Sequence, residues 1–238
     1  MRPAFARTLF VLPALFGLLA TANASPILTN GSFESGLAGW TAVDQAGGSG
    51  TWFSQTGASS PLNGFAVPAP TAGTSAAMTD QTGPGSHVLY QDFLVPTGVT
   101  AADLSFDYFI SNQAGVFFTP NTLDFIPEPN QQSRVDIITT SADPFSVAAA
   151  DVLFALLAPN ANTLAYQTFA MNLTGFLQAH EGETLRLRFA EVDNQLFFNM
   201  GVDAVNLDVV SEVPEPATLV LFGSGAAVVF LRRRRSDS

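Results

Sequence analysis

Carboxylates are the most numerous side chains here that could do acid–base or metal chemistry. Between Ser25 and Glu212 there are 18 Asp and Glu residues against three Arg, a net charge of −15. Paired carboxylates can hydrolyse glycosides, and Glu191 with Asp193 or Asp203 is the first pair to consider. Alternation places Glu191 and Asp193 beside each other on one strand face, and nothing in the sequence sets a second acid opposite them. We therefore predict a protein that is not an enzyme. Glycan hydrolysis stays as an alternative, ranked third after the two noncatalytic roles described at the end of this section.

The sequence lacks the residues or motifs for thiol, zinc or iron, and serine-nucleophile chemistry. The chain has no cysteine, which removes disulfides, thiolate zinc sites, iron–sulfur clusters and thiol nucleophiles. His87 and His180 are the only histidines, and without a paired spacing they argue against a zinc or iron site. Gly223-Ser224-Gly225 lies in an apolar tail, so this serine is no nucleophile elbow, which needs a strand, a sharp turn and a helix.

The elements that must position these residues are short strands. From residue 27 to 210 the dominant pattern is period-two alternation broken by Gly, Pro, Asn and Ser, which is typical of antiparallel strands with one wet face. We predict an all-β antiparallel β-sandwich over residues 25–212. The expected strands lie at residues 40–43, 50–55, 74–80, 87–95, 103–108, 135–137, 164–171, 183–189 and 205–209.

Two segments depart from this pattern. Ser146 to Leu157 is the one helical candidate, because Ala148 to Ala150 have high helix propensity and Pro159 stops the run. Residues 112–132 form a long loop, a kind of segment that tends to carry function or disorder. If a loop binds a ligand, Val116 to Thr119 is our first choice.

The charge balance restricts the partners. A strongly acidic domain repels nucleic acid and anionic lipid headgroups, since both require cationic contacts. We therefore expect no nucleic-acid partner, whereas divalent cations are plausible ligands.

The N-terminal residues 1–24 read as a secretory signal peptide. Arg2 and Arg7 form a positive region, a 13-residue apolar stretch follows, and Ala22-Asn23-Ala24 offers a cleavage site for signal peptidase. Ala22 and Ala24 are the expected recognition residues, with Ser25 as the mature N-terminus. The alternative is an uncleaved anchor helix, although the apolar run is short for a bilayer span of about 20 residues.

The C-terminal residues 213–238 have three parts: Pro214-Glu215-Pro216, an apolar run at 217–231, and the four arginines Arg232, Arg233, Arg234 and Arg235. As a helix the run would be roughly 22 Å long, marginal against a bilayer core of roughly 30 Å. The arginines would hold the end on the cytoplasmic side and leave Pro-Glu-Pro outside.

This composite resembles the PEP-CTERM sorting signal. The resemblance implies a transmembrane helix before processing, cleavage by an exosortase-type protease at Pro214-Glu215-Pro216, and delivery to the cell envelope, outer surface or extracellular matrix. Pro127-Glu128-Pro129 repeats the tripeptide but is followed by polar residues. A simple tail anchor is the alternative.

A second resemblance concerns the domain itself. Asn30-Gly31-Ser32-Phe33-Glu34 with Gly39-Trp40, and Gly201 to Leu207, resemble the first and last strands of galactose-binding-like jelly rolls, with Ala204 where that pattern has Asn. The resemblance implies a calcium ion between these strands, with Glu34 and Asp203 as ligands. The alternative is an exposed Glu34 and an Asp203 that caps a turn. A melting temperature indifferent to chelator would discard the calcium site.

We therefore expect an exported, noncatalytic surface or matrix protein. The alternative is a carbohydrate-binding module for exopolysaccharide, in which exposed aromatic rings would stack on sugars. Trp40 and Trp52 are the aromatic candidates, although both fit the core better. Saturable binding to the cell's own polysaccharide, lost on replacing an aromatic residue, would favour the module.

Overall fold

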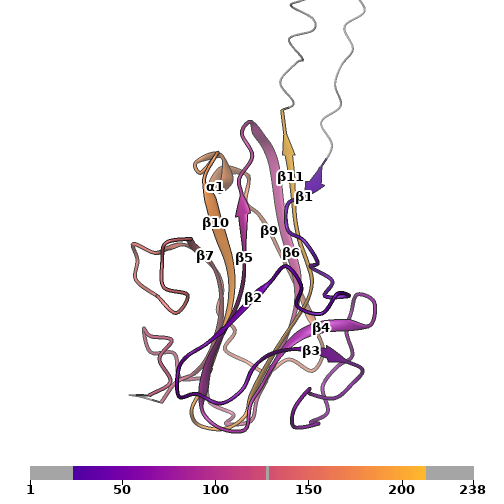
Figure 1. The fold of residues 1–238 in the computed structure, drawn as a ribbon, viewed down its shortest axis with the longest axis vertical. Coiled ribbons are helices and arrows are strands. Elements are labelled where there is room, and N and C mark those ends of the chain that lie inside the picture. The colour runs from indigo at the N-terminus through magenta and orange to yellow at the C-terminus, as the bar shows by residue number, and fades with distance from the viewer. Residues whose placement is uncertain (1–23, 127–128, 213–238) are drawn as a thin grey trace, which may run out of the picture. The chain divides into compact units, whose positions relative to one another are not determined.

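The computed structural model describes residues 24–126 and 129–212, which fold as two antiparallel sheets packed face to face (Figure 1). The all-β sandwich predicted from the alternation is confirmed. The predicted terminal helices, the sorting tripeptide and the four C-terminal arginines lie outside the described residues, as does all of the predicted signal segment except Ala24.

The first sheet has the order β3-β4-β11-β6-β9, with β1 paired to β11. Every pairing in it is antiparallel. The longest ladder joins β6 to β11, which gives this sheet a central pair of long strands. Its strands are β1 (Ser25–Pro26), β3 (Thr51–Thr56), β4 (Ser75–Asp80), β6 (Val99–Asn112), β9 (Gln167–Asn172) and β11 (Phe198–Ser211).

The second sheet has the order β2-β5-β10-β7-β8 and is likewise antiparallel. Its centre is β10, which is paired along its length with β5 on one side and with β7 on the other. The strands are β2 (Thr41–Asp44), β5 (Gly85–Leu94), β7 (Gln131–Thr139), β8 (Val152–Leu157) and β10 (Thr184–Asp193).

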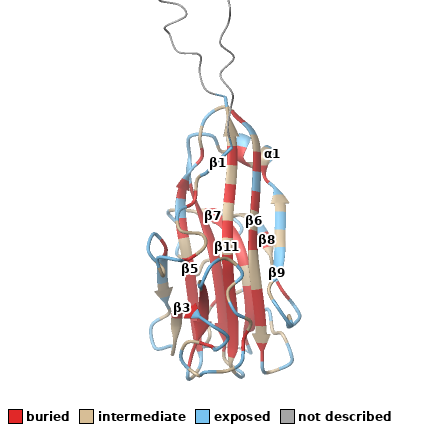
Figure 2. Ribbon diagram, turned by 90° about the vertical axis from the view of Figure 1, so that its right-hand side faces the viewer, coloured by how far each residue is buried: buried red, intermediate tan, exposed pale blue. Residues whose placement is uncertain are grey.

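The core lies between the sheets and follows from the alternation. On β10, Leu185, Leu187 and Phe189 face the first sheet and join one buried apolar cluster with residues of β6 and β11. Figure 2 shows the buried residues concentrated on the long central strands. Because β10 and β11 are central in their sheets, polar residues on their inner faces are enclosed as well.

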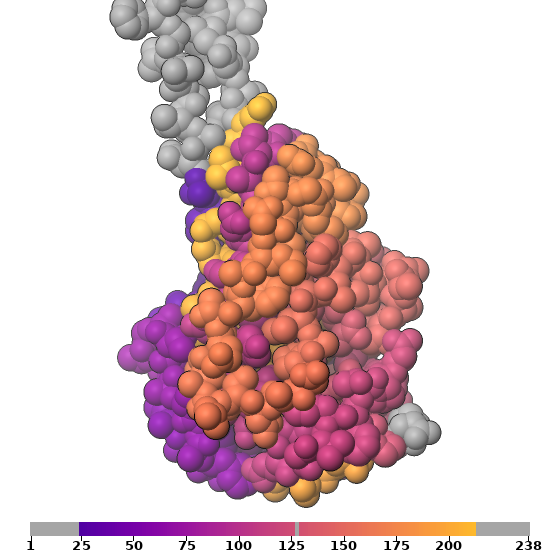
Figure 3. Space-filling view, turned by 180° about the vertical axis from the view of Figure 1, so that it is seen from behind, coloured from indigo at the N-terminus to yellow at the C-terminus, as the bar shows by residue number. Residues whose placement is uncertain are grey.

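The outer face of the second sheet is covered by loops. Arg188 points outward from β10 yet is fully buried. Asp136 and the carbonyls of Pro144 and Ser146 accept its hydrogen bonds. In the view from behind, the segments after β7, coloured salmon to orange, occupy much of the visible surface (Figure 3). The chain thereby buries a cation that alternation alone would leave in water.

The predicted helix at residues 146–157 is wrong. Residues 152–157 are the edge strand β8, paired with β7, and the preceding alanines form a turn. The Ser146 carbonyl accepts a hydrogen bond from Arg188 rather than from a helical N–H. Val152-Leu153-Phe154 gains more by pairing and packing as a strand than the alanines gain from helix propensity.

The helix that does form is a single turn, α1 (Thr174–Gln178), which buries Leu177. Among residues 24–126 and 129–212, no helix is long and apolar enough to cross a membrane.

The sandwich has two distinct ends. β1 pairs with the last residues of β11, with Ser25 opposite Val209, so the first and last described strands meet at one end (Figure 1). The other end holds the start of β5, the end of β10 and the start of β11, because Gly85 is paired with Asp193. The candidate site below belongs to this second end.

Candidate functional site

Three buried titratable side chains meet at this end, between the sheets. His87 on β5 lies opposite Glu191 on β10 in the ladder, and Asp193 follows two residues later on the same face. One ligand atom from each residue lies within 4.8 Å of the other two. The register between β5 and β10 brings the histidine to the carboxylates, although His87 and Glu191 are 104 positions apart in the sequence.

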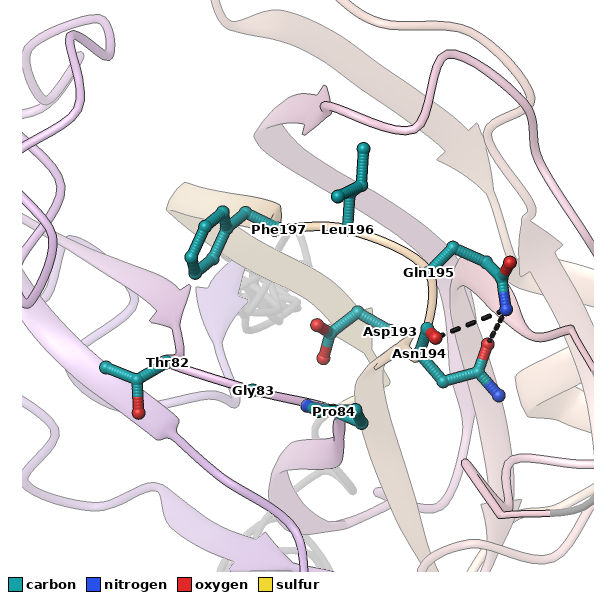
Figure 4. A pocket seen from close by; sticks show the side chains of 8 residues that line it. All are labelled: Thr82, Gly83, Pro84, Asp193, Asn194, Gln195, Leu196 and Phe197. Carbon is teal, nitrogen blue, oxygen red and sulfur yellow. Dashed lines mark hydrogen bonds between the residues drawn. The ribbon is translucent and has the colours of Figure 1, made fainter.

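An open pocket leads to this cluster. It has a volume of about 180 Å³ and is lined by residues 82–84 and 193–197. Figure 4 shows the Asp193 carboxylate directed into the space between Thr82-Gly83-Pro84 and Phe197. Leu196 at the rim is 55% exposed. Water and small ions can therefore reach Asp193 from outside.

The hydrolase alternative finds no support in this geometry. Glu191 and Asp193 lie side by side as alternation predicts, but Glu191 is fully buried and Asp193 almost so. Burial raises the pKa of Glu191 well above its usual range, and the neighbouring Asp193 raises it further. Asp203 lies on the other sheet, paired with Asp107. A glycan cannot contact Glu191, because that carboxylate is fully buried.

Glu34 and Asp203, the predicted calcium ligands, hold one turn between them. The Glu34 carboxylate accepts hydrogen bonds from the N–H groups of Thr74 and Ser75, at 2.8 Å each. Asp203 accepts them from Thr71 and Ala72, at 2.7 and 2.8 Å. The turn at residues 71–75 is therefore fixed by two carboxylates, one from each end of the domain's sequence.

Gly73 shows how tightly this turn is built. Its φ is +72°, and a Cβ placed there would collide with the Glu34 carboxylate. The hydrogen bonds from Thr74 and Ser75 lower the pKa of Glu34. For Asp203 burial raises the pKa, and the hydrogen bonds offset this in part. Both carboxylates accept hydrogen bonds from backbone N–H groups of this turn, and calcium at these residues stays a prediction.

The residues that resemble a jelly-roll opening are structural. Asn30 donates to the carbonyls of Gly36 and Ala38, and Trp40 donates from its indole to the Asn30 carbonyl at 3.1 Å. The ring centroids of Phe33 and Trp40 lie 5.4 Å apart. Trp40 and Trp52 are 8% and 2% exposed, so neither is a sugar platform.

The predicted binding loop, Val116 to Thr119, is partly exposed and carries an isolated bridge from Phe118 to Gln131. It does not line the pocket at Asp193. Carbohydrate binding by these or other residues stays a prediction.

Sequence reasoning missed the role of His87. Its neighbours in space, Asp44 on β2 and Glu191 on β10, are far from it in the sequence. The only signal available was the alternation, which turns His87, Glu191 and Asp193 to the inner faces of their strands. Without the register, those residues could not be placed side by side.

The protein is an antiparallel β-sandwich with a buried polar cluster at one end. A family profile described as the PEP-CTERM protein-sorting motif then matches residues 212–235. The chain therefore carries this motif, which indicates a protein exported to the cell envelope or extracellular surface.

Solved structures resemble this one in part, at low sequence identity. TmCBM61, determined in complex with beta-1,4-galactotriose, is 11% identical with a TM-score of 0.48, over 79% of this chain and 99% of that one. The K1 cleaved adhesin domain of Lys-gingipain from Porphyromonas gingivalis W83 is 11% identical with a TM-score of 0.46, over 82% and 100%. No curated protein matches the sequence. Likenesses this remote assign no activity to this chain.

Proposed function

We propose that this protein is an exported, noncatalytic surface or matrix protein, cleaved after export by an exosortase-type protease at Pro214-Glu215-Pro216. The observation that carries the proposal is the sorting-motif match at residues 212–235. That match includes the tripeptide, the apolar run and all four arginines. The short apolar run favours a transient pause in the membrane over a permanent span, and the arginines favour a cytoplasmic end.

The noncatalytic part of the proposal is supported by burial. Of the carboxylates that sequence reasoning offered to a hydrolase, Glu191 is enclosed in the sandwich, Asp193 is 3% exposed and Asp203 is committed to a turn. Retaining and inverting glycosidases both require two carboxyl groups that flank the scissile bond. These three residues offer no such pair.

The two Pro-Glu-Pro copies provide a matched test. Replacing Pro214, Glu215 and Pro216 with alanine is expected to leave the protein in the membrane fraction with its arginine tail attached. The same replacement at Pro127, Glu128 and Pro129 is expected to leave processing unchanged, since no apolar run follows it. Fractionation with antibodies to the domain and to a C-terminal tag reads the outcome. Equal processing of wild type and the first variant would contradict the proposal.

A further inference from the structure

Four buried atoms at the end of the sandwich with the pocket have no hydrogen-bond partner among the described residues. They are Nε2 of His87, both carboxylate oxygens of Glu191 and Oδ1 of Asp193. His87 and Glu191 are 0% exposed and Asp193 is 3% exposed. Buried polar atoms are almost always paired in folded proteins, because an unpaired one costs the full desolvation penalty. Four such atoms on three clustered residues indicate a missing shared partner.

We propose that His87, Glu191 and Asp193 bind one divalent transition-metal ion, for which zinc is the probe. One imidazole nitrogen and two carboxylates form a common donor set for such an ion. In tetrahedral zinc sites, bonds of about 2.1 Å place the ligand atoms about 3.4 Å apart. The ligand atoms here lie within 4.8 Å of one another, so modest side-chain movements complete the site.

A neighbouring carboxylate prepares the histidine for this role. Nδ1 of His87 lies 2.8 Å from Oδ1 of Asp44. A carboxylate at Nδ1 favours the tautomer that carries its proton there, which leaves the lone pair of the unpartnered Nε2 available to a cation. Metal-binding histidines usually have such a partner on the nitrogen that does not bind the metal. Asp44 is therefore a positioning residue.

A counter-charge is also missing beside the two carboxylates. Two adjacent carboxylates are buried, and none of the ion pairs among the described residues involves Glu191 or Asp193. A divalent ion supplies two positive charges at the place where both carboxylates meet.

Access and specificity are consistent with a transition metal. The pocket opens onto Asp193, so a hydrated ion can enter and a water molecule can complete the coordination. Gln81 hydrogen-bonds Asp193 and leaves its own buried Oε1 without a partner. The imidazole favours zinc over calcium, which takes six to eight oxygen ligands.

The test uses the full chain, purified in mild detergent with a tag that lacks histidine. After dialysis against a chelator, the protein is titrated with zinc chloride by calorimetry and analysed for metal. We expect about one zinc ion per chain and a melting temperature that rises with zinc. Calcium at the same concentration is expected not to displace the zinc. Absence of stoichiometric zinc would overturn the proposal.

Three variants separate metal binding from folding. Glu191→Gln and Asp193→Asn keep the side-chain shapes but remove a buried charge, so the metal-free variants should melt no lower than metal-free wild type. Both should bind zinc at least tenfold more weakly, and Asp44→Asn roughly 10- to 100-fold more weakly. His180→Ala is the control, because that imidazole lies 3.0 Å from Glu183 outside the cluster and should leave zinc binding unchanged. Zinc affinity unaffected by Glu191→Gln and Asp193→Asn would refute the site.

Discussion

At the scale of single residues, Ala204 sits where the backbone is least suited to it. Its φ is +50°, inside a register shift between Asp203 and Asn206 on β11. The Ala204 N–H donates to the Asp203 carboxylate at 2.7 Å, which holds the strained conformation. Asn adopts this region more readily than alanine. The position where galactose-binding-like patterns have Asn is thus a bulge with a left-handed residue.

This strain predicts a stabilising substitution. Ala204→Asn should raise the free energy of unfolding by up to about 1 kcal/mol, because the left-handed region costs alanine about 1 to 2 kcal/mol. Urea unfolding followed by circular dichroism measures the change. Ala170→Asn, on β9 where φ is not positive, is the control and should be neutral or destabilising. Equal loss of stability in both variants would show that the bulge carries no strain.

At the scale of elements, one buried carboxylate fixes the long connection between β3 and β4. Asp80, at the end of β4, accepts hydrogen bonds from the N–H groups of Leu62 and Asn63, at 2.7 and 2.9 Å. It also accepts one from the Asn63 side chain. Burial raises the pKa of Asp80, but the hydrogen bonds from Asn63, Leu62 and Ser60 outweigh it and lower the pKa overall.

Asp80 should therefore stabilise the fold in a pH-dependent way. A group whose pKa is lower in the folded state stabilises above its unfolded pKa, about 3.9 for Asp. That stability is lost as the pH falls through the folded value. We expect Asp80→Asn to lower the free energy of unfolding by about 1 to 3 kcal/mol at neutral pH, and the difference from wild type to shrink in acid.

Urea titrations at several pH values check this expectation. Asp103→Asn, an exposed position on β6, should change stability little at any pH. A difference between wild type and Asp80→Asn that stays constant down to the acid range would contradict the role assigned to this carboxylate.

The strands were predictable because their signal is local. Residues 183–189 alternate, and the structure forms β10 there with Leu185 and Leu187 inward. The helix at 146–157 was not excluded by local signals, because the contacts that decide it come from Arg188 and from β7. The N-cap of α1 is Leu173, which makes no side-chain cap hydrogen bond. The sequence therefore lacked the polar N-cap residue that would indicate the start of this helix.

The candidate site was predictable only in part. Alternation places Glu191 beside Asp193, and it does so correctly. The sequence could not place His87 opposite Glu191, since that depends on the register between β5 and β10. The sequence likewise indicated Glu34 and Asp203 as a pair of acidic residues. It did not reveal that N–H groups of residues 71–75 donate hydrogen bonds to both carboxylates.

At the scale of the molecule, the sandwich separates its two kinds of site. The strands that begin and end the domain, β1 and β11, meet at one end, while the His87 cluster lies at the other (Figure 1). The described part of the chain from Ser25 to Ser211 therefore begins and ends at the same end of the sandwich. The end with the pocket holds the start of β11, whose last residues lie at the opposite end.

The central claim is that this domain is exported and released from both terminal segments. Intact mass spectrometry of the protein recovered from the native cells and their medium tests it most directly. We expect a species that begins at Ser25 and lacks the residues after Pro214-Glu215-Pro216. A full-length chain in the cytosol, or a mature chain that still carries Arg232 to Arg235, would contradict it.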